Sequence, residues 1–387
     1  MACGRLLSAL KKNSFEEKVA VVSAEAEVGY NRVLLPGLVA GDCSELDLSL
    51  TEEWSDWPQL TLLTETNAEF LDLQSRLVRT DAHGEISFKR LVFATGSSVV
   101  RPDLQGLPDS RVLPLRNIAD AQSIKHSLVE ASTVAVLGGG LLGLEGAEAI
   151  ARMGHTVHVV HRGSHLMNRQ LDADSGMRLA EALKGRGLHV HLGCSIERAK
   201  MGEGANSQIA LTLSNGELVH VDHVVLATGV RPNVDLARAS GIPCNFGIEV
   251  DRYMATGCRE VYAIGECAEV VGEHHALVEA VNLQADTLAA NLCGEDVQLE
   301  SRVCGTTLKL ADLPLFAIGE TATPRPTDAW VDDATMSVYR RLFMKGEQLV
   351  GSVLYGDTRA SRGIASRIGQ SLSLEEQEHL LFGTVPG

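Results

Sequence analysis

The sequence contains no closely spaced pair of cysteines. Its eight cysteines are scattered along 387 residues without one Cys-x-x-Cys motif. This excludes a local redox disulfide and the usual ligand spacings of iron–sulfur clusters and structural zinc. The thirteen histidines include no His-Glu-x-x-His motif either. We therefore predict that the chain holds no metal.

The sequence also lacks a long apolar run and an excess of positive charge. No stretch approaches the roughly 20 apolar residues that a membrane-spanning helix needs. Near the N-terminus, Arg5 precedes any apolar run, unlike the pattern of a secretory signal. The formal net charge of -16 argues against nonspecific binding of nucleic acid. We expect a cytoplasmic protein with neither a membrane nor a nucleic acid as partner.

Two stretches share one pattern, in which a hairpin leads into a buried strand that ends at Ala-Thr-Gly. The first has its turn at 81–84 and ends at Thr95 and Gly96; the second has its turn at Asn215-Gly216 and ends at Gly229. An Asn-Gly turn predicts a hairpin because both turn positions favour positive φ. Ligands of parallel sheets bind at the carboxyl ends of the strands. The repeat therefore predicts an α/β chain with two Rossmann-like dinucleotide-binding domains.

A glycine-rich loop gives the most specific motif, Gly-x-Gly-x-x-Gly, at positions 138–143. It lies within a predicted strand–helix–strand unit formed by 133–137, 144–153 and 156–160. In such a unit Gly138 permits the tight turn, Gly140 lets a pyrophosphate approach the backbone, and Gly143 lets the helix pack on the strand. The loop therefore predicts a nucleotide site.

The residues that follow the second strand of this unit are His161 and Arg162. An acidic residue there favours NAD, whereas a nearby arginine accommodates the 2′-phosphate of NADP. Arg162 fits the second case, but an exposed arginine at a strand end is equally consistent with a solvated side chain. The residues themselves leave the choice of nicotinamide nucleotide open.

Four segments, at 30–35, 159–161, 166–172 and 261–269, make the chain resemble the pyridine nucleotide-disulfide oxidoreductase-like flavoprotein reductases. The most similar members are the flavin module of the assimilatory nitrite reductase large subunit and the rubredoxin reductases. The resemblance implies three domains along almost the whole chain. They are an FAD-binding domain at 1–112 and 232–303, an NAD(P)H-binding domain at 113–231, and a small α+β domain at 304–387.

The resemblance also implies residues that bind FAD. Glu25 would hold the adenine ribose, Arg32 would contact the phosphate side, and Thr95 and Gly96 would pass close to the flavin. In the segment that ends at Gly265 and Glu266, the acid would bind the ribityl chain. From the residues alone, Glu266 is also explained as an acid that favours the N-terminus of a helix.

On the nicotinamide side, the resemblance places Glu145 where hydride passes to the flavin, as the catalytic residue. A solvated helix residue is the plain alternative for Glu145. His161 stands where nitrite-reductase-like modules carry histidine, and this implies NADH as the favoured nucleotide.

The sequence departs from the family pattern at three places. The family opens with a strand and a glycine-rich loop for the FAD pyrophosphate, whereas this sequence starts at Met1 inside that pattern. We expect the natural polypeptide to begin some residues upstream, which an intact mass would test. Ser98 and Pro36-Gly37 replace an arginine and a Ser-Lys pair of many relatives, which affects the fine tuning of the flavin.

The C-terminal part predicts strands at 307–310, 337–344 and 348–354 and a helix near 358–368. It also carries a locally basic stretch, which is a candidate docking surface for an acidic electron carrier and is equally consistent with a solvated face. Its basic residues are Arg340, Arg341, Lys345, Arg359, Arg362 and Arg367.

The predicted function is electron transfer from NAD(P)H through FAD to a separate acceptor protein. The acceptor would be a nitrate or nitrite reductase, or a rubredoxin-like iron–sulfur protein in the alternative of a rubredoxin reductase. A nucleotide-binding protein without turnover stays open as a different class. The sequence leaves open whether two copies form a homodimer.

Overall fold

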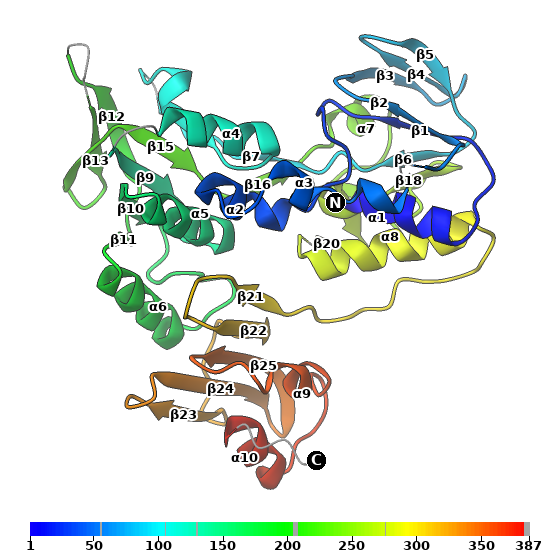
Figure 1. Ribbon diagram of the computed structural model, residues 1–387. Coiled ribbons are helices and arrows are strands. Elements are labelled where there is room, and N and C mark those ends of the chain that lie inside the picture. The colour runs from blue at the N-terminus through cyan, green and yellow to red at the C-terminus, as the bar shows by residue number, and fades with distance from the viewer. Residues whose placement is uncertain (55, 105, 129–130, 204–207, 275, 383–387) are drawn as a thin grey trace. The chain divides into compact units, whose positions relative to one another are not determined.

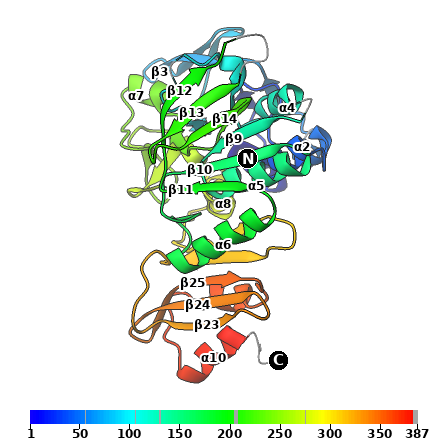
Figure 2. The same cartoon turned by 90° about the vertical axis from the view of Figure 1, so that its left-hand side faces the viewer.

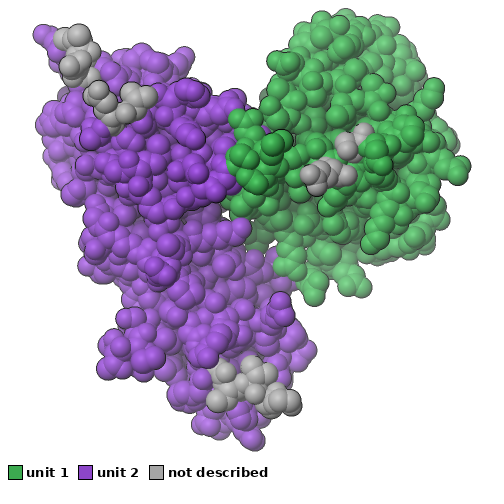
Figure 3. All heavy atoms as spheres, viewed as in Figure 1, with its two compact units in different colours: residues 1–34, 44–98, 230–302 green, residues 35–43, 99–229, 303–387 purple. Residues whose placement is uncertain are grey.

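The computed structural model describes residues 1–382 except 55, 105, 129–130, 204–207 and 275. The chain forms two compact units, coloured separately in Figure 3. Unit 1 comprises residues 1–34, 44–98 and 230–302, and unit 2 comprises residues 35–43, 99–229 and 303–387. Each unit is therefore assembled from segments that are far apart in the sequence.

Unit 1 contains short parallel strand pairs and small antiparallel sheets (Figure 1). Three pairs are parallel: β1 (Val19–Val22) with β2 (Leu60–Leu63), β6 (Leu91–Phe93) with β18 (Val261–Ala263), and β17 (Ile248–Val250) with β19 (Ala268–Val270). The other strands are β3 (Ala68–Asp72), β4 (Leu77–Thr80), β5 (Gly84–Ser87), β7 (Ser97–Val99), β16 (Val230–Pro232) and β20 (Glu273–His274). The helices are α1 (Ala2–Lys12), α3 (Glu45–Leu48), α7 (Asp235–Ala239) and α8 (Val278–Leu292).

The first helix shows how the sequence forms the core of unit 1. Along α1, Leu6, Leu7 and Leu10 recur at helical spacing and are all buried. They join a cluster that includes Trp54 and Ala285, both fully buried. The apolar stripe of α1 therefore fixes this helix against the rest of unit 1.

The first part of unit 2 is a parallel sheet of five strands in the order β11-β10-β9-β15-β8. Its strands are β8 (Val112–Pro114), β9 (Thr133–Leu137), β10 (Thr156–His161), β11 (His189–Leu192) and β15 (His223–Leu226). Its helices are α2 (Leu35–Ala40), α4 (Ile118–Ser127), α5 (Leu141–Arg152) and α6 (Ala173–Gly185). An antiparallel sheet precedes β15 and consists of β12 (Ile196–Met201), β13 (Ile209–Leu213) and β14 (Leu218–Val221).

The predicted repeat is confirmed, because β4–β5 leads into β6 as β13–β14 leads into β15. One detail of the second turn differs from the prediction. Gly216 has a φ of +84°, but Asn215 is not among the residues with positive φ. The Asn215 side chain instead accepts a hydrogen bond from the Glu217 N–H at 3.1 Å. A side chain that bonds its own turn therefore replaces the second left-handed residue.

The last part of unit 2 is an antiparallel sheet in the order β21-β22-β25-β24-β23 (Figure 2). Its elements are β21 (Thr306–Leu308), β22 (Leu315–Gly319), β23 (Ala329–Asp333), β24 (Val338–Lys345), β25 (Gln348–Tyr355), α9 (Ser361–Ala365) and α10 (Leu374–Phe382). The strands and the helix predicted for this region are confirmed. Among the described residues, no helix combines the length and the apolar character needed to cross a bilayer.

Candidate functional site

The glycine loop of unit 2 leaves no room for side chains at two of the three glycines of the Gly-x-Gly-x-x-Gly motif. Gly138 has a φ of +122°, and a Cβ there would lie 2.1 Å from the carbonyl oxygen of Ala227. A Cβ on Gly143 would lie 2.0 Å from the carbonyl oxygen of Gly138. Both contacts are impossible for a real side chain, so only glycine lets β9, β15 and α5 approach this closely.

Gly140 lies in a different environment, because nothing stands within 4 Å of the position of its Cβ. It is the N-cap of α5, with extended backbone and no side-chain cap, and the first turn of α5 contains no acid. The backbone N–H groups of this turn and the positive end of the helix dipole favour an anion here. The loop therefore fits the pyrophosphate of a dinucleotide.

His161 closes this loop from the end of β10. Its Nδ1 accepts a hydrogen bond from the Gly139 N–H at 3.2 Å, and its Nε2 lies 3.1 Å from Oδ1 of Asn168. Burial lowers the pKa of His161, with Asn168 opposing this shift. The ring is therefore uncharged at neutral pH, with Nε2–H as the donor to Asn168. The next residue, Arg162, is exposed.

Glu145 lies in the second turn of α5, and its side chain is nearly buried, with 9% exposed. Its Oε1 accepts a hydrogen bond from the backbone N–H of Lys309 at 2.9 Å. Burial raises the pKa of Glu145 to about 7, although the hydrogen bond from Lys309 opposes the rise. Glu145 can therefore hold or release a proton near neutral pH. Its plain alternative, a solvated helix residue, is wrong.

Glu25, predicted at the adenine ribose, and Arg32, predicted on the phosphate side of FAD, contact each other. Nη2 of Arg32 lies 2.5 Å from Oε1 of Glu25, and the hydroxyl of Tyr30 donates to Oε2 of Glu25 at 2.5 Å. The guanidinium of Arg32 also stacks over the ring of Tyr30, 4.7 Å from its centroid. Tyr30 was not predicted as a site residue, although it stands in the segment that carries the resemblance. It orients both predicted side chains.

The turn after β6 is held by a residue that the sequence analysis missed. The side chain of Asn233 donates to the carbonyl oxygen of Thr95 at 2.8 Å, and its backbone N–H donates to that of Gly96 at 2.9 Å. In return, the hydroxyl of Thr95 donates to the carbonyl oxygen of Asn233 at 2.7 Å. No local motif marks Asn233, because its partners lie 138 residues away along the chain.

The turn after β18 carries Gly265 and Glu266. Gly265 has a φ of +80°, and a Cβ there would lie 2.8 Å from the Cβ of Ala2. This glycine therefore lets the N-terminal end of α1 lie against the carboxyl end of β18. The carboxylate of Glu266 accepts a hydrogen bond from the hydroxyl of Ser97 at 2.7 Å.

These features of unit 1 fit FAD. The end of an 11-residue helix, α1, lies beside a glycine turn at the carboxyl ends of two parallel strands, which is where such sheets bind phosphate-bearing ligands. The predicted polar residues follow the ends of β1, β6 and β18. Their donors and acceptors match hydroxyl-rich and anionic parts of a dinucleotide.

The basic stretch of the C-terminal sheet differs from the prediction, because two of its arginines are buried. Arg340 is 4% exposed and pairs with Asp357 at 2.5 Å. Arg341 is 9% exposed, and its guanidinium contacts Asp328 at 3.1 Å and Asp172 at 3.4 Å. A docking surface that includes these two residues is therefore wrong, and reversing their charges would disrupt the fold.

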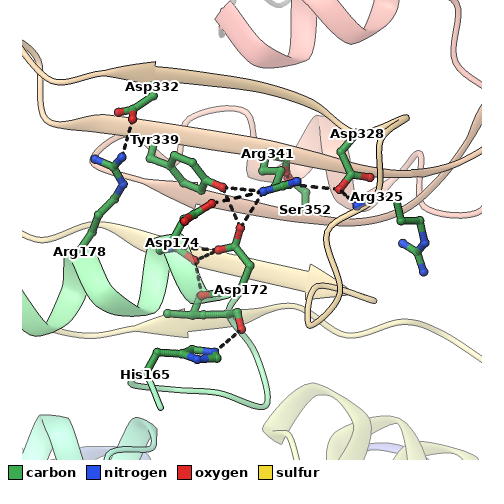
Figure 4. A network of polar contacts seen from close by, with 12 residues as sticks. His165, Asp172, Asp174, Arg178, Arg325, Asp328, Asp332, Tyr339, Arg341 and Ser352 are labelled. Atoms are coloured by element: carbon green, nitrogen blue, oxygen red, sulfur yellow. Dashed lines mark hydrogen bonds and ion pairs between the residues drawn. The ribbon is translucent and has the colours of Figure 1, made fainter. Parts of the chain in front are cut away.

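The contacts of Arg341 belong to a buried polar network within unit 2 (Figure 4). Asp172 is fully buried and caps α6 by accepting from the Ser175 N–H at 3.0 Å. The hydroxyl of Tyr339, on β24, donates to Oδ2 of the same carboxylate at 2.7 Å. The network therefore connects α6 to the C-terminal sheet.

A glycine loop that opens a helix and a second set of nucleotide-type residues at strand ends define a flavin-dependent NAD(P)H oxidoreductase with FAD and NAD(P)H as cofactors. The chain belongs to the pyridine nucleotide-disulphide oxidoreductase family, whose model matches residues 5–283. The model of the rubredoxin NAD+ reductase C-terminal domain matches residues 305–372. The expected family and fold class are confirmed.

The chain is similar to two proteins of Bacillus subtilis (strain 168). It is 33% identical to a nitrite reductase (NAD(P)H) over 93% of this chain and 45% of that protein. It is 31% identical to an assimilatory nitrate reductase electron transfer subunit over 90% of this chain and 45% of that protein. The chain thus spans about half the length of these relatives.

The fold is that of a solved ferredoxin reductase from Rhodopseudomonas palustris. The TM-score is 0.85 at 22% identity, and the match covers 98% of this chain and 95% of that one. This similarity extends over all the segments described above, including the C-terminal sheet.

Proposed function

We propose that this chain passes electrons from a nicotinamide nucleotide, through FAD, to a separate redox protein of nitrate or nitrite assimilation in the cytoplasm. The observation that supports the proposal is the glycine loop at Gly138, Gly140 and Gly143, whose tight turn and open position at Gly140 fit the pyrophosphate of a dinucleotide. The two Bacillus relatives supply the link to nitrite and nitrate.

In this proposal the chain has the three domains expected from the sequence. Residues 113–231 bind the nicotinamide nucleotide, residues 1–112 and 232–303 bind FAD, and residues 304–387 form the third domain. On the nucleotide side, His161 and Arg162 lie at the adenine ribose, and Gly229 follows the strand whose end abuts the loop. These residues would hold the two cofactors, and FAD would supply the hydride-accepting and electron-transferring chemistry.

The residues of unit 1 have separate roles toward FAD. Glu25, held by Tyr30, accepts from the adenine ribose, and Arg32 contributes positive charge toward the phosphates. The turn of Thr95 and Gly96 supplies backbone groups near the ring, and Gly265 and Glu266 bind the ribityl side. Each of these residues orients the cofactor and leaves the redox chemistry to it.

Glu145 is the group we assign to the nicotinamide. Its burial keeps the carboxyl group protonated at or below neutral pH, since its pKa is about 7. A neutral carboxyl does not attract the positive charge of the oxidised nicotinamide, whereas a carboxylate does. The proton on Glu145 thus adjusts the relative binding of the reduced and oxidised nucleotide.

The acceptor is a separate protein in this proposal. The described residues contain no group of three or more His, Cys, Asp or Glu side chains arranged for a metal ion. Iron–sulfur or sirohaem chemistry would therefore be supplied by the partner. We leave the number of copies in the assembly to a measurement of mass in solution.

A rubredoxin reductase is the second candidate, favoured by the match of residues 305–372 to the C-terminal domain of that family. In this case the acceptor would be a small rubredoxin-like iron–sulfur protein. The two candidates share the flavin step and differ only in the protein that takes the electrons.

The test follows the absorbance of the flavin in the purified chain, supplied with FAD, under anaerobic conditions. Bleaching on addition of NADH or NADPH supports an enzyme, and its absence refutes it in favour of a nucleotide-binding protein without turnover. Reoxidation by a nitrite reductase catalytic module or by rubredoxin then distinguishes the two acceptors.

A further inference from the structure

The segment from His161 to Leu171 is the part of the nucleotide site with the most unusual charge. It contains two arginines and two histidines and not one acidic residue. The first acid after it, Asp172, is fully buried; its carboxylate accepts a hydrogen bond from the Tyr339 hydroxyl and pairs with Arg341. The end of β10 is therefore positive, without the carboxylate that binds the ribose hydroxyls in NAD-specific sites.

His161 cannot substitute for that carboxylate. A carboxylate accepts hydrogen bonds from both ribose hydroxyls, but the two nitrogens of His161 are already engaged with the Gly139 N–H and with Asn168. The ring packs closely against Gly139 and Gly163. A Cβ on Gly139 would lie 2.9 Å from Cγ of His161, and a Cβ on Gly163 would lie 2.6 Å from its Nε2. The 2′-position of a bound ribose thus meets no free acceptor on this residue.

The backbone that carries the arginines is held in place from two sides. The Met167 N–H donates to the carbonyl oxygen of Gly139 at 2.8 Å, which fixes the segment to the glycine loop. The Gly193 N–H donates to the carbonyl oxygen of Gly163 at 2.9 Å, which fixes it to the end of β11. These two hydrogen bonds connect the loop to both neighbouring segments of unit 2.

Two cations on this loop have no counter-charge. Arg162 and Arg169 are both exposed, and within the described part of the chain neither forms an ion pair. The hydroxyl of Ser164, also exposed, lies between them in sequence and 3.1 Å from Nδ1 of His165. A guanidinium binds a phosphate through two parallel hydrogen bonds, and a hydroxyl adds a further donor.

We infer that this loop binds the 2′-phosphate of a 2′-phosphorylated adenine nucleotide through Arg162 and Arg169, so that the chain uses NADPH in preference to NADH. The inference deepens the proposed function and rests on it. It differs from the preference for NADH that the histidine at 161 implies by resemblance. The geometry explains the difference, since the two ring nitrogens of His161 bind Gly139 and Asn168 and are not available to the ribose.

The experiment titrates the full chain by calorimetry with three probes: adenosine 2′,5′-bisphosphate, adenosine 3′,5′-bisphosphate and adenosine 5′-monophosphate. We expect the 2′,5′ isomer to bind at least about tenfold more tightly than the other two, because a charge-assisted bidentate contact typically contributes 1.4 kcal/mol or more. Equal affinity for the two bisphosphates would show a general attraction of anions and overturn the inference.

Variants assign the effect to the arginines. Arg162→Ala and Arg169→Ala should each weaken the 2′,5′ isomer by about tenfold while leaving adenosine 5′-monophosphate unchanged. Arg198→Ala is the matched control, because Arg198 is an exposed arginine elsewhere in unit 2. If all three variants behave as the parent chain, the arginines do not bind the phosphate and the inference fails.

These probes contain no nicotinamide and require no flavin. A chain that does not reduce FAD therefore still answers whether the 2′-phosphate is recognised. Conversely, a chain that reduces FAD with NADH and ignores the 2′,5′ isomer retains the proposed function and refutes only the preference for NADPH.

Discussion

Replacing Glu145 by glutamine should stabilise the protein, and more so as the pH rises. In the folded chain the pKa of Glu145 is about 7, against an ordinary value of 4.5. The folded state therefore keeps a proton that the unfolded chain releases between these two pH values. Stability from this group is fully present below about pH 4.5, falls as the pH rises, and levels off above about pH 7.

The magnitude follows from the size of the shift. One pKa unit corresponds to 1.36 kcal/mol, so the full effect of the shift is about 3 kcal/mol. Glutamine carries no charge at any pH, and its carbonyl oxygen can still accept the hydrogen bond from the Lys309 N–H. The advantage of Glu145→Gln over the parent should therefore grow from near zero at pH 4.5 to about 3 kcal/mol above pH 7.

The assay is thermal unfolding without nucleotides at pH 5, 6, 7 and 8. For a unit of this size, 1 kcal/mol shifts the melting temperature by about 2–4 °C, so the variant should gain about 6–12 °C at pH 8. Glu181→Gln is the control, because the Glu181 side chain is 66% exposed and only pairs with Lys184 on the surface of α6. Parallel curves for Glu145→Gln and the parent from pH 5 to 8 would refute the assignment of a buried, proton-holding Glu145.

Three further substitutions test other contacts. Gly140→Asp should keep or raise the stability of the fold, since Asp is a favoured N-cap. It should weaken the binding of nicotinamide nucleotides at least about 100-fold, because the carboxylate repels the pyrophosphate. Melting curves measure the first effect and calorimetry the second, and an unchanged affinity would contradict the prediction. Asp172→Ala should cost about 3–5 kcal/mol in urea unfolding, because it removes the cap of α6, the acceptor of the Tyr339 hydroxyl and one of the two buried carboxylates that pair with Arg341. Asp172→Asn, which retains a cap for α6, should cost less; equal costs would argue against a charge effect. Asn233→Ala should lower stability by about 1–2 kcal/mol and weaken FAD in a fluorescence titration, and an unchanged FAD affinity would show that Asn233 supports the fold alone.

Local patterns predicted the elements that carry their own signals. The unit β9–loop–α5–β10 follows from three glycines at fixed spacing between apolar segments, and the structure gives each glycine a steric or approach-related reason. The ends of the two repeated strands follow from the Ala-Thr-Gly pattern. These features depend on residues within about one supersecondary unit, which is why the sequence alone was enough.

Contacts between distant segments could not be predicted in this way. Arg341 was expected on a surface because charged residues are mostly exposed, but its partner Asp172 lies 169 residues earlier. Asn233 and Thr95 are similarly remote in sequence. Only the topology of the sheets brings such pairs together, and no spacing rule in the sequence encodes it.

The carboxylate of Asp172 connects the nucleotide-binding part of unit 2 to its C-terminal sheet, so that fragments of the two should not fold independently. It is the cap of α6 and also the acceptor for Tyr339 and a counter-charge for Arg341 on β24. A shortened fragment that stops before the C-terminal sheet would leave this acid without two of its three partners, and an isolated sheet would keep Asp328 but lose the second buried carboxylate that pairs with Arg341. The two parts should therefore melt in one cooperative step, and protease cutting between them should not release two independently stable pieces.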